Sequence, residues 1–259
     1  MNAQRIRQVG GILAASSAIA LAGAAPAMAQ GWEWNVTPYV WASNLGVKVS
    51  TDARQIVDRD LAFGDLLKDV DMTAQVRLEA QRGRNGVFGD LFGNRLSKDS
   101  QIALPQMGGA PASLSSSVRM AILDAGGLFN PTGQRRGLTL FYGSRMVIQR
   151  ASVDADIAVP QAGTVSEHRD LDETKVDALA GVGVSQPLPW RLTVLVHADA
   201  SAGGTKYTWG GSAGLAFALG GRYTLTAGYR RMQIKFDAAD ATNATLTLSG
   251  MVFGVNMRF

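Results

Sequence analysis

The stretch "HADAS" holds the three residue types of a hydrolase triad, His197, Asp199 and Ser201, at alternate positions. Alternate residues of a β-strand share one face, so a strand would place all three on the same side. Such neighbours are about 6.6–7 Å apart, whereas a nucleophile and its base need to come within about 3 Å. We therefore predict no catalytic residue here and expect a protein that is not an enzyme. His168 lies in a polar stretch and is expected to be solvated.

Charged residues of both signs recur at the polar positions of alternating segments. If these positions line one narrow interior, the charges must pair, because an unpaired buried charge is very costly. The sequence thus predicts an internal network of ion pairs that fills and stiffens a barrel. Its expected members are Glu33, Asp71, Arg77, Glu79, Asp90, Arg119, Arg145, Asp177, Arg191, Asp199 and Arg230.

An acidic connector, "TDARQIVDRDLAFGDLLKDVD", contains six aspartates between Asp52 and Asp71. Carboxylate oxygens suit hard divalent cations. However, basic residues are interspersed and no D-x-D-x-D-G spacing occurs, so we predict no metal site and no cofactor. The apolar residues near Leu61 and Leu67 are enough for one or two turns of amphipathic helix.

The elements that must position these charges are strands. In the final stretch, "SGMVFGVNMRF", apolar side chains occupy every second position from Met251 to Phe259, which is the period of a β-strand. About ten segments of the chain show this alternation. In one of them Leu192 and Val194 oppose Thr193 and His197; in the ninth, Ile234 and Phe236 break the parity, which a bulge would explain.

Connector length alternates along the chain. Long polar connectors are expected near residues 51–70, 97–116 and 151–174, with short ones such as "RGRNG" and "QPLPW" between them. Outer-membrane barrels have short periplasmic turns at one end and longer external loops at the other. The pattern predicts an all-β fold, a closed antiparallel transmembrane β-barrel of about ten strands, with eight or twelve as alternatives.

Aromatic residues gather at the segment ends that adjoin the short turns. Rings of this kind anchor barrels at the boundary between membrane and water. A soluble sandwich with ordinary core aromatics is the alternative. The expected girdle consists of Trp32, Trp34, Trp190, Tyr223 and Phe259.

The N-terminus carries the pattern of a cleavable signal peptide. Arg5 and Arg7 precede an apolar stretch, and Ala27-Met28-Ala29 is a small-x-small cleavage site, so residues 1–29 are expected to be removed and 30–259 to form a single barrel domain. Cysteine is absent, which excludes disulfides and thiolate chemistry. The formal charge of +4 falls to about +2 without the two signal arginines, and no basic patch with interleaved aromatics predicts nucleic-acid binding.

Short motifs resemble a family of largely uncharacterised proteobacterial outer-membrane barrels. The opening Trp34, Tyr39 and Trp41 match its W-x-x-x-x-Y-x-W start, and the later matches are Asp199, Thr208, Trp209, Gly228, Tyr229 and Arg230. The terminal Phe259 resembles the signal read by the barrel-insertion machinery. Ala-Gly-Gly after Ser201 departs from the tighter D-x-G-G of the family. The resemblance implies a location in the outer membrane and a barrel fold, and it carries no established activity.

Together these patterns predict a monomeric outer-membrane barrel with a structural or interaction role and a lumen largely filled by side chains. Its expected partners are outer-membrane lipids, lipopolysaccharide and the insertion machinery, which would read the C-terminal strand. Two rival functions stay open at this point: a narrow pore or transporter for small solutes, and a lipid-modifying hydrolase.

Overall fold

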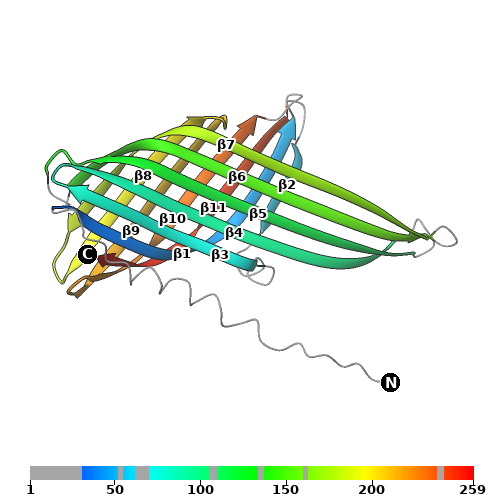
Figure 1. Ribbon diagram of the computed structural model, residues 1–259, viewed down its shortest axis with the longest axis horizontal. Coiled ribbons are helices and arrows are strands. Elements are labelled where there is room, and N and C mark those ends of the chain that lie inside the picture. The colour runs from blue at the N-terminus through cyan, green and yellow to red at the C-terminus, as the bar shows by residue number, and fades with distance from the viewer. Residues whose placement is uncertain are drawn as a thin grey trace, which may run out of the picture. The chain divides into compact units, whose positions relative to one another are not determined.

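The computed structural model describes residues 31–51, 55–61, 70–104, 110–133, 137–159, 163–237 and 242–259. Eleven strands fill most of these ranges (Figure 1). They are β1 (Glu33–Thr51), β2 (Gln55–Leu61), β3 (Val70–Arg82), β4 (Asn85–Leu104), β5 (Ala110–Phe129), β6 (Gly137–Val159), β7 (Gly163–Pro187), β8 (Leu192–Gly203), β9 (Tyr207–Gly220), β10 (Tyr223–Asp237) and β11 (Thr242–Arg258). Within the described ranges, no helix is both long and apolar enough to cross a membrane.

The sheet closes on itself through antiparallel pairing of β1 with β11, which runs from Asn35↔Arg258 to Thr51↔Thr242. On its other side β1 pairs with β3 near its start and with β2 near its end. β2 and β3 therefore share one place in the wall, and the described part of the chain forms a barrel of ten strand positions. The prediction of a closed antiparallel barrel of about ten strands is confirmed.

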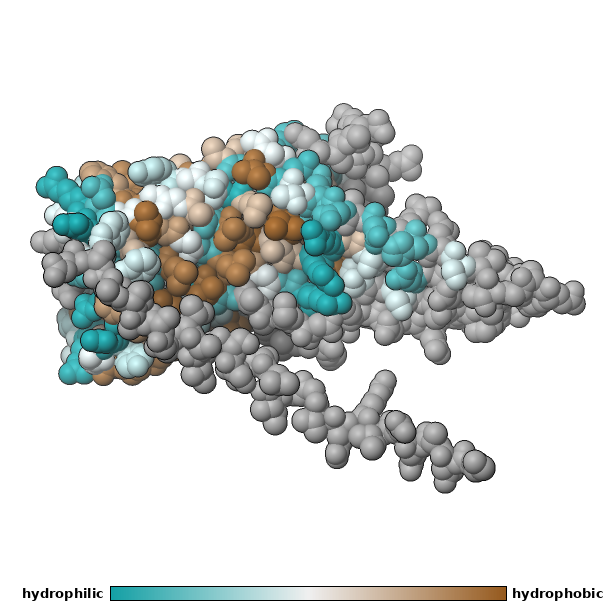
Figure 2. Space-filling model, viewed as in Figure 1, coloured by the Kyte–Doolittle hydropathy of each residue, from teal (hydrophilic) through white to brown (hydrophobic). Residues whose placement is uncertain are grey.

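Alternation along the strands separates an apolar outer wall from the lumen. On β7, Val176, Val182 and Val184 are exposed on the outside, while Asp177 and Leu179 are buried inside. β8 follows the same rule, with Val196 outside and Asp199 inside. In Figure 2 a band of hydrophobic residues crosses the visible face of the barrel and gives way to hydrophilic residues on either side. Such a band is the surface that lipid requires.

The two ends of the barrel differ in strand length. We call the end that carries the connections at 83–84, 130–136, 188–191 and 221–222 the short-turn end, and the opposite one the long-strand end. β4 to β7 have 20 to 25 residues each, whereas β8 to β10 have 12 to 15, so the first group projects further at the long-strand end (Figure 1).

This projection corrects the predicted connectors. Residues 97–104 and 110–116 continue β4 and β5, and 151–159 and 163–174 continue β6 and β7. Strand pairing goes on through these residues, from Ser97↔Ser117 to Leu104↔Ala110 and from Ala151↔Leu171 to Val159↔Gly163. In the acidic connector, Leu61 ends strand β2 where a helix was predicted; residues 62–69 lie outside the described ranges, as do signal residues 1–29.

No bulge lies near Ile234 and Phe236, where one was predicted, in the described pairing of β10; the register shift with β9 is at Tyr223/Thr224, at the start of the strand. Its register with β11 is unbroken from Tyr223↔Met257 to Asp237↔Asn243. Ile234 and Phe236 are buried in the lumen, on the face opposite Leu225 and Tyr229. The parity changes because the lumen itself becomes apolar at this height.

Candidate functional site: the closed lumen

Arg145 on β6 is the centre of a buried group of charges. Its Nε and Nη2 atoms donate to the two carboxylate oxygens of Asp124 at 2.8 and 2.7 Å. Its Nη1 atom lies 2.8 Å from Oδ1 of Asp199, an ion pair without hydrogen-bond alignment. Both carboxylates and the guanidinium are buried. One arginine thus joins β5, β6 and β8, which lie within four consecutive strands of the sheet.

A second group of charges lies on β1, β3, β4 and β10. The Arg77 guanidinium lies 2.7 Å from Glu79 and 3.4 Å from Asp90. The Tyr39 hydroxyl donates to Asp90 at 2.8 Å. Arg230 from β10 donates to the Tyr39 oxygen at 3.4 Å and comes within 3.9 Å of Asp90. These contacts connect one side of the barrel to the other.

Asp177 is buried without an arginine partner among the described residues. It accepts hydrogen bonds from the Ser201 hydroxyl at 3.0 Å and from the Thr205 backbone amide at 2.8 Å. The Thr205 hydroxyl adds a third at 2.6 Å. Three donors satisfy the carboxylate, which holds the β8–β9 hairpin in place rather than joining the arginines.

Buried apolar side chains occupy the lumen beyond the charges. One cluster lies further from the short turns, and its Met232 and Ile234 are 0% exposed. Its buried members are Trp41, Phe92, Ile122, Val147, Met232, Ile234, Phe236 and Leu248. Arg230 lies over the Trp41 ring at 4.7 Å and so connects this layer to the charges.

A smaller apolar cluster, consisting of Phe88, Leu128, Phe141 and Leu179, lies nearer the short-turn end. His197 stacks on Phe141 with ring centroids 4.4 Å apart. The ionisable side chains of the lumen differ in exposure: the Glu79 and His197 side chains are 34% and 30% exposed, whereas the Arg145 side chain is 1% exposed. Arg145 therefore lies deeper in the lumen than Glu79 and His197.

The structure brings six of the predicted network residues into these contacts, namely Arg77, Glu79, Asp90, Arg145, Asp199 and Arg230. Arg191 is corrected: it is exposed in the short turn before β8, with a φ of 63° next to 61° at Trp190. Arg119 is corrected as well, because it is exposed on the outer face of β5. Glu33 is exposed at the first residue of β1, and the side chain of Asp71 lies outside the described set.

Trp34, Trp190, Tyr223 and Phe259 of the predicted aromatic girdle lie at the short-turn end. The Phe259 amide donates to the Trp34 carbonyl at 2.9 Å, so these two rings flank the seam between β1 and β11. Trp190 is 86% exposed in its turn, and Tyr223 is exposed at the start of β10. Trp32 immediately precedes β1.

The sequence analysis did not identify Asp124 as a member of the charged group around Arg145. Asp124 has the parity of Ile122 on β5, so its position in the lumen could be predicted from the sequence, but its pairing with Arg145 follows only from the strand register.

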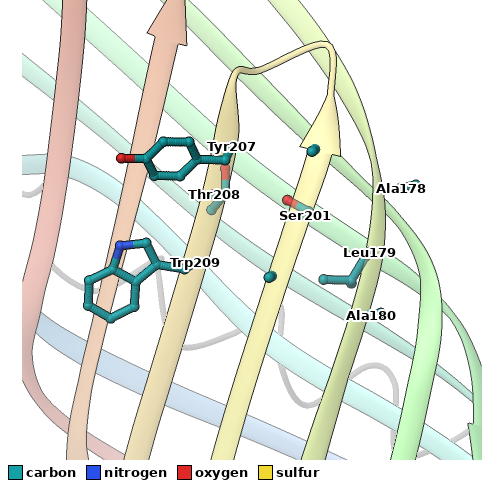
Figure 3. A pocket seen from close by; sticks show the side chains of 9 residues that line it. Ala178, Leu179, Ala180, Ser201, Tyr207, Thr208 and Trp209 are labelled. Carbon is teal, nitrogen blue, oxygen red and sulfur yellow. The ribbon is translucent and has the colours of Figure 1, made fainter.

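At the long-strand end, Tyr207 and Trp209 point outward from β9 next to a recess of about 400 Å³ between β7, β8 and β9 (Figure 3). Four alanines, Ala178, Ala180, Ala200 and Ala202, line this recess, which belongs to the apolar outer wall.

The "HADAS" residues do not form a triad. His197 Nε2 lies 3.3 Å from Asp199 Oδ2, closer than the strand spacing suggested, because the two side chains lean together. Ser201 instead donates to Asp177. In the described part of the chain, no group of three histidine, aspartate or glutamate side chains is arranged to hold a metal ion.

No protein-family model matches the chain, and no curated protein matches its sequence. Among solved structures, it is similar to the attachment invasion locus protein Ail of Yersinia pestis, at 13% identity and a TM-score of 0.34, over 88% of this chain and 99% of the other. The translocator domain of autotransporter NalP from Neisseria meningitidis matches at 14% identity and a TM-score of 0.44, over 94% of this chain and 93% of the other. The toluene transporter TodX of P. putida matches at 8% identity and a TM-score of 0.36, over 89% of this chain and 91% of the other. The ring closure between β1 and β11, rather than these likenesses, defines the fold.

Proposed function

We propose that this chain is a monomeric barrel of the bacterial outer membrane, with a structural or interaction role and a lumen that does not conduct. The observation that carries the proposal is the apolar layer across the lumen, in which Met232 and Ile234 have no exposed surface. A water-filled path through that layer would leave these side chains partly exposed. The outer apolar band and the closed ring of strands support the membrane location.

The projecting parts of β4 to β7 are the surface on which an external partner would act. They extend the wall beyond the apolar band and carry charged pairs such as Arg150–Asp172. Lipids and lipopolysaccharide would contact the outer wall, and the insertion machinery would read the C-terminal strand ending at Phe259. No chemistry is assigned to the lumen, since Ser201 and Asp177 are engaged with each other.

Conductance in planar lipid bilayers tests the closed lumen. The wild-type protein is expected to give no steady current, and a Met232→Ala/Ile234→Ala variant is expected to conduct because it removes the apolar layer. Leu225→Ala, on the lipid face of the same strand, is the matched control and should give no steady current. Steady current through the wild type would overturn the proposal and favour a narrow pore. A heat-dependent shift on a denaturing gel checks that each sample is a folded barrel.

A further inference from the structure

Three arginines form a row across the outer face of the projecting wall. Cross-strand register places Arg95 opposite Arg119 and Arg119 opposite Arg150. All three face outward, because their neighbours Asn94, Met120 and Gln149 have the parity of the lumen residues on the same strands. Side chains directly opposite each other on antiparallel strands are about 4.5–5.5 Å apart at Cβ, and like charges at that spacing repel.

The arginine row marks the upper edge of the apolar wall. On β5 the outward positions below Arg119 are Ala121 and Leu123, and on β6 those below Arg150 are Ile148 and Met146. On β4, Gly93 and Leu91 precede Arg95. In Figure 2 the hydrophobic band likewise ends against hydrophilic residues on the side of the projecting strands. This height is where the headgroups of membrane lipids would lie.

The acidic residues nearby pair with Arg150 and with His168. Asp172 pairs with Arg150 at 3.0 Å. Asp170 accepts from His168 at 2.8 Å. Among the described residues, Arg119 makes no ion pair or hydrogen bond, although it stands between two other arginines.

A shallow groove of about 240 Å³ lies at this row. Arg119 and Arg150 line it together with the hydroxyls of Ser117 and Ser152, which are 2.9 Å apart. Asp170 and Asp172, the partners of His168 and Arg150, line it as well. Arginine forks and hydroxyl donors are the groups that bind phosphate oxygens. We propose that the arginine row binds the phosphate of an outer-leaflet lipid headgroup, with Arg119 as the central contact. This inference rests on the proposed membrane location.

The test uses the full-length barrel purified in neutral detergent and native mass spectrometry with a bisphosphorylated lipid A as the probe. Arg119→Gln is expected to weaken lipid retention roughly tenfold, because it removes a charge-assisted contact to phosphate. Arg150→Gln should weaken it in the same direction. Arg231→Gln is the matched control: Arg231 is an outward arginine on β10 that lies 6.0 Å from the Trp209 ring. It should leave retention unchanged.

Three results would overturn the proposal. One is equal retention of dephosphorylated lipid A by the wild type, and another is an equal loss in Arg231→Gln and Arg119→Gln. The third is displacement of the lipid by millimolar inorganic phosphate, which would indicate a site for free phosphate. A heat-dependent gel shift is recorded for each sample. Loss of that shift would count against the barrel itself, whereas loss of lipid retention with the shift intact counts only against the arginine row.

Discussion

At the residue scale, His168 on the projecting part of β7 is held between two carboxylates. Asp154 and Asp170 bond to its two ring nitrogens and raise its pKa above the ordinary 6.5, with Asp154 the larger cause. Because the folded pKa is raised, this contribution to stability is complete below pH 6.5 and is lost as pH rises through the folded pKa.

The first prediction is an imidazole titration midpoint above 6.5 for His168. Asp154→Asn should move the midpoint down, because it removes a partner that favours the charged ring. NMR titration of the ring protons measures this, with the spectrum of a His168→Gln variant assigning the signal. An unchanged titration midpoint in Asp154→Asn would contradict the contact between Asp154 and His168.

Arg145 also acts at the residue scale, since it is the cation between Asp124 and Asp199. Arg145→Met would leave two buried carboxylates facing each other and is expected to lower the free energy of unfolding by about 3–5 kcal/mol. Asp124→Ala should cost less, because Asp199 still balances the arginine. Urea unfolding followed by tryptophan fluorescence measures both.

A double-mutant cycle checks the pairing itself. Arg145→Met combined with Asp124→Ala should cost less than the sum of the two single changes, because fewer charges are left without a partner than that sum implies. Additive costs would mean that the two side chains do not interact.

At the element scale, the alternation along each strand predicted which face of the sheet a residue lies on but not which residues it contacts there. Asp199 and Arg145 were expected in the lumen and lie there, yet Asp177 is satisfied by the hydroxyls of a hairpin that only register brings near. Phe92, Met232 and Ile234 escaped prediction because alternation was interpreted as apolar outside and polar inside. A lumen that is itself partly apolar breaks that rule without any bulge.

Glycine spacing on β7 determines how large lumen side chains fit. Gly181 pairs with Phe141, and a Cβ at Gly181 would overlap the Phe141 ring and lie 2.6 Å from the Ala198 carbonyl oxygen. Two residues along the same face, a Cβ at Gly183 would meet nothing closer than 3.9 Å.

Gly181→Ala is therefore expected to destabilise the barrel by about 1–3 kcal/mol, the usual cost of overpacking. Gly183→Ala is the matched control and should be close to neutral. Urea unfolding of the two variants in the same detergent makes the comparison. Equal costs would show that Phe141 is not packed against this strand.

At the scale of the whole molecule, the outer wall must match the thickness of a bilayer. On β7 the outward positions from Val176 to Val184 are apolar or small, and Gln186 follows at the short-turn end. Strands tilted by about 35–45° cover an apolar band of about 25 Å with roughly ten residues. Ala180 is at the centre of this stretch, so it should lie near the midplane, while Gln186 should lie near the interface.

An arginine at each of these two depths tests the placement of the barrel. Ala180→Arg is expected to cost about 2–4 kcal/mol in a lipid bilayer, because the charge must enter the hydrocarbon midplane. Gln186→Arg should cost about 0–1 kcal/mol, since the side chain reaches the headgroups. Guanidinium unfolding titrations in phospholipid bilayers measure both. In water the two outward positions would be equally solvated, so similar costs would mean that this wall does not face lipid, whereas a depth-dependent difference requires a membrane around the closed ring.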